Sequence, residues 1–475
     1  MRFLLAAALA LAPIPALAQA TPDVVTPILA EAGPGTRWGI VVADAEGREI
    51  VAINPEGRFM PASNTKLYTT AAALWAEARG EGPNLAESGA AVRLEGADVV
   101  LTGRGDARLS GKPGCVVDCL SVLADAVAAK TRRVRDVVGD GTLFPDQRWS
   151  PGMSWNNIPT NSGTGVSALS VDDNELAATV TPGTLGAAPA VSLPAYYRVE
   201  NHARTVAGDG DTLAFDRAPN GRVLVVSGTL GIAHAPVAWK LGVDDPADYA
   251  AWQLAQMLKA RGVKVTGQVR SRHRPILPED DPKLRLGAPV RAPQPAPLAV
   301  LAPGLLGEDV TTINKASQNL HAELLLRRLG LAKGTGSIAD GQAAVMAMLA
   351  EAGVTPLQVS LSDGSGMSSY NRVTPRATVK LLQFAARQPW GDVFRASLPI
   401  GGIDGTLRRR FAGTPLEGKL FAKTGTLNAT NALAGWLVAA SGKTLTFAIY
   451  ANDVPEDVRA TGIMDRALLA LAAAN

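Results

Sequence analysis

Residues 60–70 read MPASNTKLYTT and place Ser63 three positions before Lys66, at the start of an apolar stretch. Apolar residues recur at helical spacing from Leu67 onward, so we expect Ser63 at or next to a helix N-terminus. Lys66 then lies one turn further along, on the same face of the helix. The stretch is either an ordinary helix start with Ser63 as its N-cap, or a nucleophile with its base one turn away.

The chemistry of the second interpretation is specific. A serine hydroxyl is a poor nucleophile until a neighbour takes its proton, and a lysine can do so if burial or nearby positive charge lowers its pKa. Free backbone N–H groups at a helix N-terminus can stabilise an oxyanion. The Ser-x-x-Lys pattern occurs once, and neither Gly-x-Ser-x-Gly nor His-Glu-x-x-His competes with it. Because serine N-caps are common, the pair needs support from other motifs.

A second element is Lys423-Thr424-Gly425, which also occurs once, within the expected strand KLFAKTGTL. Its lysine and the hydroxyls of Thr424 and Thr426 could bind a substrate carboxylate. Alone, the element could equally be a strand end with a solvated lysine. In serine enzymes that combine Lys-Thr-Gly with Ser-x-x-Lys, a Ser-x-Asn element completes the set.

Ser-x-Asn occurs three times, so its context has to decide. The copies at Ser154 to Asn156 and Ser369 to Asn371 lie in stretches that read as loops. The copy at Ser317 to Asn319 lies in INKASQNLHAELLLRRLG, which we expect to form a helix, and it falls between the other two motifs in chain order. We therefore choose Ser317 and Asn319.

With these three motifs in order, the chain resembles the penicilloyl serine transferases. The long separation of Ser63 from Ser317 makes it similar to the class C low-molecular-mass penicillin-binding proteins, a D-Ala-D-Ala carboxypeptidase/endopeptidase family with two domains inserted in the transpeptidase fold. It departs from that family at Gln318, where aspartate is more usual, and within GRGDARLSGKPGCVVDC. Stretches that match the family are GVSALSVDDNE, LSDGSGMSSYNRVTP, SLPIGGIDGTLRRRF and AKTGTLNATNALAGW.

The resemblance implies a role for each motif residue. Ser63 attacks the D-Ala-D-Ala carbonyl, Lys66 takes its proton, and Ser317 relays a proton to the leaving amine. The backbone N–H groups of Ser63 and Thr426 form the oxyanion hole. Asn319 holds the substrate amide, and the terminal carboxylate is held by the Lys-Thr-Gly strand. The expected substrate-binding residues are Asn319, Lys423, Thr424, Gly425 and Thr426.

A hairpin near the start of the chain and three strands near its end indicate one antiparallel sheet built from both termini. We expect an α+β fold: a penicilloyl-serine-transferase (β-lactamase/transpeptidase-like) domain with antiparallel sheet and helices, plus two inserted domains. The expected boundaries are 1–20 for a signal peptide, 21–85 and 292–475 for the catalytic domain, 86–175 and 241–291 for inserted domain II, and 176–240 for inserted β domain III.

Residues 1–20 have the charged start, apolar run and small-residue cleavage site of a secretory signal. We expect an exported or periplasmic protein with no integral membrane span, because the apolar run is shorter than the roughly 20 residues that cross a bilayer. A net charge of +3 without a lysine or arginine block argues against a nucleic-acid partner. Four scattered histidines and two cysteines favour neither a metal nor another cofactor.

Cys115 and Cys119 could be bridged in an oxidising compartment or could be free thiols, and the sequence leaves both open. A loop this short would contribute only about 2 kcal/mol in the chain-entropy account of disulfides.

The expected function is that of a serine D,D-peptidase of peptidoglycan, a carboxypeptidase, an endopeptidase or both, acting on stem peptides through an acyl-enzyme on Ser63. β-Lactam antibiotics are its expected inhibitors. The alternatives are a serine β-lactamase or esterase and a catalytically silent cell-wall binding protein. No recognisable motif places an acidic residue as a deacylation base, which favours slow turnover of penicillin.

Overall fold

The computed structural model describes residues 23–82, 89–289, 295–302 and 304–475. The expected signal peptide, residues 1–20, lies outside these ranges. So do the expected domain boundaries at residues 85/86 and 291/292. Within the described ranges, no helix combines the length and the apolar character needed to cross a membrane.

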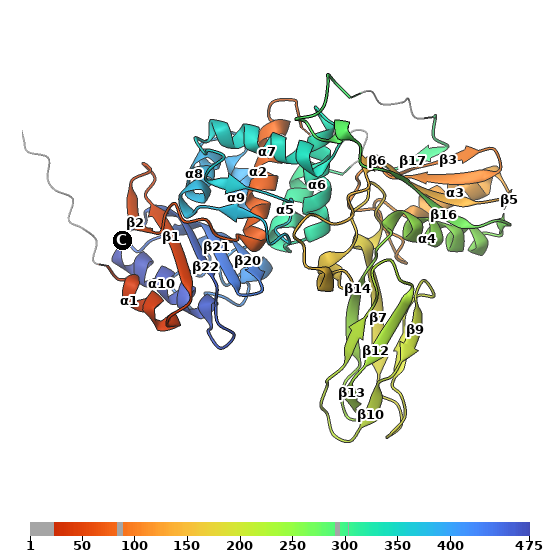
Figure 1. Ribbon diagram of the computed structural model, residues 1–475, viewed down its shortest axis with the longest axis horizontal. Helices are drawn as coiled ribbons and strands as arrows, with labels where there is room; N and C mark the ends of the chain where they lie inside the picture. The colour runs from red at the N-terminus through yellow and green to blue at the C-terminus, as the bar shows by residue number, and fades with distance from the viewer. Residues whose placement is uncertain (1–22, 83–88, 290–294, 303) are drawn as a thin grey trace, which may run out of the picture.

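The first sheet joins the two ends of the chain, as expected for the α+β fold (Figure 1). Its N-terminal strand pairs with the last strand of the chain in antiparallel register, from Arg37 opposite Asn452 to Ala43 opposite Thr446. Five antiparallel strands follow the order β2 (Glu49–Ile53), β1 (Arg37–Ala43), β22 (Thr444–Asn452), β21 (Thr430–Val438) and β20 (Leu420–Leu427). β20, which carries the Lys-Thr-Gly element, is therefore an edge strand.

Helices cover both faces of this sheet. One face packs against α10 (Ala460–Ala474) and α1 (Thr26–Leu29). The other face carries a larger cluster built around α2 (Thr65–Glu77), which is buried from Thr65 to Ala76. A helix that is buried on all sides belongs to the core, so α2 is held rigidly. Its neighbours in this cluster are α5 (Leu306–Lys315), α6 (Asn319–Leu331), α7 (Ile338–Glu351), α8 (Pro375–Ala386) and α9 (Gly391–Ser397).

A second five-stranded sheet forms a separate body with its own core. Helices α3 (Leu120–Lys130) and α4 (Pro246–Ala260) contribute their buried side chains to that core. The strand order is β16 (Val269–Arg274), β6 (Val137–Pro145), β4 (Asp98–Thr102), β3 (Ala91–Glu95) and β17 (Ala299–Val300). A two-stranded pair, β5 (Arg133–Val134) with β15 (Lys264–Val265), adjoins it.

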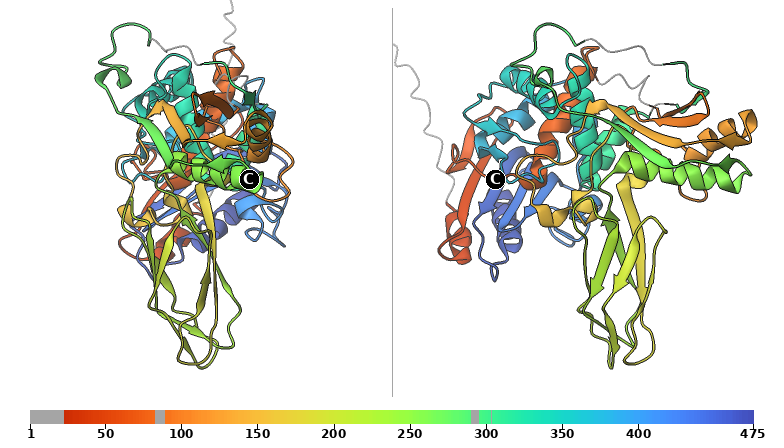
Figure 2. Two further views of the ribbon diagram at one scale, coloured as in Figure 1. Left: turned by 90° about the vertical axis from the view of Figure 1, so that its right-hand side faces the viewer. Right: turned by 45° about the vertical axis from the view of Figure 1, so that its right-hand side comes forward.

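Residues 176–240 contain strands and no helix, and they project from the junction of the two bodies (Figures 1 and 2). We call this projection the β module. Its antiparallel base is formed by β7 (Glu175–Thr181) and β14 (Val237–Gly242). Its remaining strands are β8 (Ala190–Ser192), β9 (Arg198–Asn201), β10 (Arg204–Val206), β11 (Ala214–Asp216), β12 (Val223–Ser227) and β13 (Thr229–Gly231).

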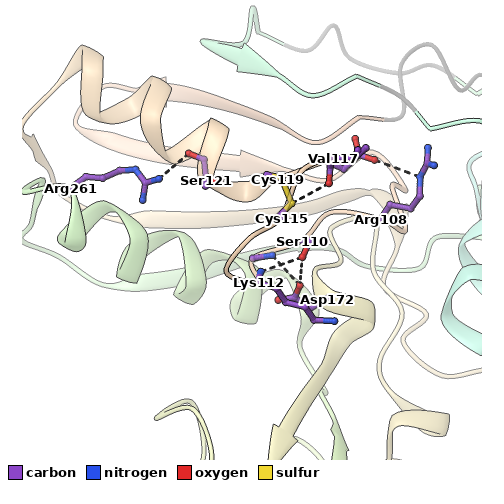
Figure 3. Close-up of a disulfide and its surroundings, with 11 residues drawn as sticks. Arg108, Ser110, Lys112, Cys115, Val117, Cys119, Ser121, Asp172 and Arg261 are labelled. Carbon is purple, nitrogen blue, oxygen red and sulfur yellow. Dashed lines mark hydrogen bonds and ion pairs between the residues drawn. A yellow bond between two sulfur atoms is a disulfide. The ribbon is translucent and has the colours of Figure 1, made fainter.

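Cys115 and Cys119, which the sequence left open, form a disulfide at the start of α3 (Figure 3). The bridge closes a short loop in which Asp118 lies 3.6 Å from Arg108. The same guanidinium lies 3.7 Å from Asp309 of α5. The disulfide loop therefore borders a charged contact between the second body and the first.

The single helix expected over residues 313–330 is wrong, because the structure has two helices there. Residues 313–330 are divided between α5, which ends at Lys315, and α6, which begins at Asn319. Ser317 adopts a left-handed backbone with φ of 59°, which no α-helix can continue through. Gln318 then caps α6, because its Oε1 accepts from the Leu320 N–H at 3.1 Å.

Candidate active site

Ser63 lies in a short 3-10 turn, Ala62–Asn64, that leads directly into α2. Ala62 has a positive φ of 47°, an uncommon backbone conformation for a residue with a side chain. Ser63 is half-buried, whereas its neighbours on both sides are buried. The strained turn therefore leaves the Ser63 side chain as the accessible group of this segment.

Two glycines press against the Ser63 segment from opposite elements. A Cβ on Gly425 of β20 would lie 2.6 Å from the Pro61 carbonyl oxygen and 3.1 Å from the Ser63 nitrogen. A Cβ on Gly366, in the loop after β18 (Val359–Ser360), would lie 1.9 Å from the Ala62 carbonyl oxygen. Only glycine allows these approaches. The glycine of the Lys-Thr-Gly element thus brings β20 against the backbone of Ser63.

Lys66 is fully buried, and its amine has three acceptors. Nζ lies 3.0 Å from Ser63 Oγ, 2.7 Å from Asn319 Oδ1 and 2.6 Å from the Ser365 carbonyl oxygen. Carbonyl oxygens can only accept hydrogen bonds, so Asn319 and Ser365 each require an N–H of Lys66. A neutral amine has two N–H groups, and its lone pair is then left for the hydroxyl of Ser63.

Burial lowers the pKa of Lys66 to about 7, although the negative charges of Asp363 and Glu323 oppose that fall. A substantial fraction of the amine is therefore neutral near neutral pH. A base with a pKa close to the working pH combines availability with useful basicity.

Ser317 and Lys423 form the second half of the site. Nζ of the fully buried Lys423 donates to Ser317 Oγ at 2.9 Å and to the Thr424 carbonyl oxygen at 3.0 Å. Burial lowers the pKa of Lys423 well below its usual range, and the nearby positive charge of Lys66 lowers it further. The left-handed backbone of Ser317 places this side chain between two helices, at the point where it meets β20.

Asn319 connects Lys66 to the second body. Its Oδ1 accepts from Lys66, and its Nδ2 donates to the Ser162 carbonyl oxygen at 3.1 Å. Both polar ends of the side chain are therefore bound to protein. Because the amide has two N–H groups and its oxygen has two lone pairs, these two contacts do not use the full hydrogen-bonding capacity of Asn319, and it can hold a substrate amide as the sequence suggested.

The edge of β20 carries the expected carboxylate-binding hydroxyls. Thr426 is exposed, and Thr424 is half-buried with its Oγ1 2.7 Å from Thr406 Oγ1. Thr406 lies in a loop whose Asp404 pairs with Lys315 at the end of α5. The sequence missed Thr406 as a site residue, although the stretch that contains it was among those that match the family.

Within the part of the chain that the structure describes, the other two Ser-x-Asn copies form no hydrogen bond with Lys66 or Lys423. Ser154 Oγ donates to Asn156 Oδ1 within an exposed turn. Asn371 is buried and donates to Asp363 Oδ1 at 2.7 Å.

The structure also places two acidic residues behind Lys66 that the sequence did not single out, Glu323 and Asp363. Glu323 is 6% exposed and Asp363 is fully buried. Glu323 forms an i,i+4 pair with Arg327 on α6, which is buried from Leu320 to Gly330. Because charges are rarely buried without a partner, opposite charges four positions apart on either side of the apolar residues Leu324, Leu325 and Leu326 are a signal that could have identified Glu323.

The chain is similar to known proteins over most of its length. A family model described as the D-Ala-D-Ala carboxypeptidase 3 (S13) family matches residues 25–472. A D-alanyl-D-alanine carboxypeptidase of Actinomadura sp. (strain R39) is 33% identical over 441 residues, covering 88% of this chain and 78% of that protein. The D-alanyl-D-alanine carboxypeptidase DacB of Haemophilus influenzae is 26% identical over 360 residues, covering 73% of this chain and 71% of the relative.

Solved structures agree in fold. Penicillin binding protein 4 (dacB) from Haemophilus influenzae superimposes with a TM-score of 0.75 at 22% identity, covering 94% of this chain and 97% of that one. A structure of the same protein complexed with a β-lactam gives a TM-score of 0.69 at 21% identity, with the same coverage.

Proposed function

Since the chain belongs to the D-Ala-D-Ala carboxypeptidase 3 (S13) family, we propose a residue-level mechanism for it as a serine D,D-peptidase of peptidoglycan. Ser63 is the nucleophile and Lys66 its general base. The observation that carries this assignment is the set of three oxygens around Lys66 Nζ. The two carbonyl oxygens, of Asn319 and Ser365, accept from the two N–H groups of the neutral amine, so its lone pair faces the Ser63 hydroxyl.

In the first step, Ser63 Oγ attacks the carbonyl carbon of the penultimate D-Ala while Lys66 takes the hydroxyl proton. The carbonyl oxygen becomes an oxyanion. The backbone N–H groups of Ser63 and Thr426 stabilise it, and the close approach of Gly425 to the Ser63 nitrogen supports this role.

The C–N bond then breaks, and the leaving amine of the terminal D-Ala takes a proton. Ser317 relays this proton from Lys66, which returns to its neutral form, and the 2.9 Å contact of Ser317 with Lys423 supports its place in the site. Water next attacks the ester on Ser63, releases the shortened peptide and restores the hydroxyl. Lys423, Thr424 and Thr426 hold the terminal carboxylate, for which β20 offers the buried amine of Lys423 and two hydroxyls at the sheet edge.

The inhibitor, the location and the domain division complete this proposal. Penicillins acylate Ser63 because their strained amide presents a carbonyl and a carboxylate like those of the peptide.

Residues 1–20 direct export, so that the enzyme meets peptidoglycan outside the cytoplasm. Residues 86–175 with 241–291, and residues 176–240, form two inserted domains. The hydrophobic core of the second sheet, which is separate from the cores on the two faces of the first sheet, supports the separation of these inserted residues from the catalytic domain.

Mass spectrometry after incubation with a penicillin tests the assignment of Ser63. We expect one covalent adduct that maps to Ser63, no adduct in Ser63→Ala, and D-Ala release from a peptide ending in D-Ala-D-Ala by the wild type only. Nitrocefin is the control substrate for the alternative activity. Rapid, sustained nitrocefin hydrolysis without D-Ala release would identify a β-lactamase instead, and an adduct on another residue would contradict the nucleophile.

A further inference from the structure

The loop after β18 reaches Lys66 through one backbone carbonyl. The Ser365 carbonyl oxygen accepts from Lys66 Nζ at 2.6 Å, the shortest of the three contacts of that amine. The position of the base therefore depends on what holds this peptide unit. Two buried carboxylates do so, one from α6 and one from the loop itself.

Glu323 binds the loop backbone from α6. Its Oε1 accepts from the N–H groups of Gly364 and Ser365, both at 2.9 Å. Its Oε2 accepts from Arg327 Nη1 at 2.8 Å. Glu323 also follows Asn319 by one helical turn, so the two side chains share one face of α6. Asn319 accepts from Lys66 directly, and Glu323 holds the Ser365 peptide, whose carbonyl is another acceptor of Lys66.

Asp363 closes the loop on itself. Its carboxylate accepts from the N–H of Gly366 at 2.9 Å, the N–H of Ser368 at 2.6 Å and Asn371 Nδ2 at 2.7 Å. Ser150 Oγ of the second body lies 3.4 Å away. These bonds fix the turn in which Gly366 presses on the Ala62 carbonyl, directly before the nucleophile.

We propose that Glu323 and Asp363 are positioning residues that act through Lys66: they hold the Ser365 carbonyl against its amine, and their negative charge sets the pH at which that amine can take the proton of Ser63. This inference rests on the proposed function, in which Lys66 is the base. It adds to the mechanism two acidic residues that lie outside the sequence motifs.

The charged groups around Lys66 have opposing effects. Glu323 and Asp363 face it as anions, and Arg327 lies behind Glu323. Lys423 is a second buried amine nearby, and burial and the charge of Lys66 lower the pKa of Lys423 well below its usual range. Burial alone disfavours the ammonium form, and the two carboxylates restore part of its stability. Burial, together with the neighbouring charge of Glu323, raises the pKa of Asp363 to about 6. Removing one negative charge should therefore lower the pKa of Lys66.

Glu323→Gln removes the charge and keeps a carbonyl oxygen for the two loop N–H groups. Arg327 keeps the Glu323 backbone carbonyl at 3.0 Å and the Gln147 carbonyl at 2.8 Å as partners. The measurement is the second-order rate of acylation by a fluorescent penicillin as a function of pH. We expect the midpoint of the acid limb to move down by about 1 pH unit or more, because less acid is needed to leave Lys66 neutral.

Asp309→Asn is the matched control. It breaks the buried Asp309–Arg328 pair, 3.1 Å long, which involves the residue of α6 directly after Arg327. We expect it to lower the melting temperature without moving the midpoint. A role for Glu323 in stability alone predicts the same behaviour for Glu323→Gln, so an unmoved or raised midpoint in a folded Glu323→Gln enzyme would overturn the proposal.

Two further measurements separate the possible failures. Asp363→Asn removes the second charge and should shift the midpoint in the same direction. Lys66→Ala tests the underlying function separately. Acylation of that variant at the wild-type rate would remove lysine from the mechanism, whatever the glutamate does.

Discussion

Lys66 combines two properties that a surface lysine cannot have. It is fully buried, which lowers its pKa to about 7, and it is bound by two carbonyl oxygens that fix the direction of its lone pair. A solvated lysine would be protonated at neutral pH and free to rotate. The residue's chemistry is therefore a consequence of its burial in α2 and of the groups that face it.

Lys66→Ala should reduce the rate of acylation of Ser63 by penicillin by roughly 10²–10⁴-fold, the usual contribution of a positioned general base. Stopped-flow fluorescence with a reporter penicillin measures this rate. Circular dichroism and a thermal melt should show that the variant is folded. A folded variant that reacts at the wild-type rate would exclude the base role.

Thr406 is the second residue whose role can be tested alone. Thr406→Val keeps the branched shape and removes the hydroxyl that lies 2.7 Å from Thr424 Oγ1. Loss of one such hydrogen bond costs about 1 kcal/mol, so we expect KM for a peptide ending in D-Ala-D-Ala to rise about five-fold. The rate at saturation should change little. An unchanged KM would show that Thr424 is oriented without Thr406.

At the scale of elements, the site lies where a helix start, a helix break and an edge strand meet. The break at Ser317 was not expected because the apolar pattern continues across it: Ile313 and Leu320 are both buried and lie seven positions apart, as in an unbroken helix. Gln318 caps the second helix through its side-chain oxygen, as an aspartate there could. The departure from the family's usual residue therefore preserves the local backbone.

Gly425→Ala tests the contact between β20 and the nucleophile. The added Cβ would lie 2.6 Å from the Pro61 carbonyl oxygen, so either the strand or the Ser63 turn must move. Since a misplacement of about 1 Å can cost 10²-fold in rate, we expect acylation to fall by roughly that factor. Acylation kinetics measure the effect.

Gly307→Ala is the control for that substitution. Gly307 lies in α5, with no atom within 4 Å of an added Cβ. Alanine favours a helix by about 1 kcal/mol over glycine in the interior, so this variant should be equally active and no less stable. Equal activity of the two glycine variants would mean that β20 tolerates the shift.

At the scale of the whole molecule, the two bodies meet at the site. The segment from Gln147 to Ser162 contributes backbone carbonyls to Arg327 and Asn319, and Ser150 approaches Asp363. The second body is thus part of the surroundings of the base. The β module contacts that body instead, through Arg217, which is buried against Asp244.

Replacement of residues 182–236 by a short Gly/Ser turn should therefore leave acylation of Ser63 within a few-fold of the wild-type rate. Val180 and Val237 are register partners of β7 and β14, so a short turn can join the two strands. The melting temperature should fall, because Asp244 loses its buried partner Arg217. Penicillin labelling with a thermal melt tests both points. A folded, soluble variant that no longer reacts would show that the module supports the site.

The sequence by itself determined the fold class and the identity of the motifs. Hydrophobic periodicity marks strands and helices locally, and the i,i+3 spacing in a helix places Lys66 beside Ser63 whatever the rest of the chain does. The same local logic identified the terminal hairpin and the C-terminal strands as parts of one sheet. The assignment of Ser317 and Asn319 also came from order along the chain.

Only the tertiary structure decided what surrounds these motifs. Contacts of Lys66 with Ser365 and Asn319 join residues that are distant in sequence, and the left-handed backbone at Ser317 has no signature in apolar spacing. The burial of Glu323 and Asp363 is likewise a property of the packed loop and helix. A pKa depends on charges and dielectric in three dimensions, so the behaviour of the base could not be predicted from its motif alone.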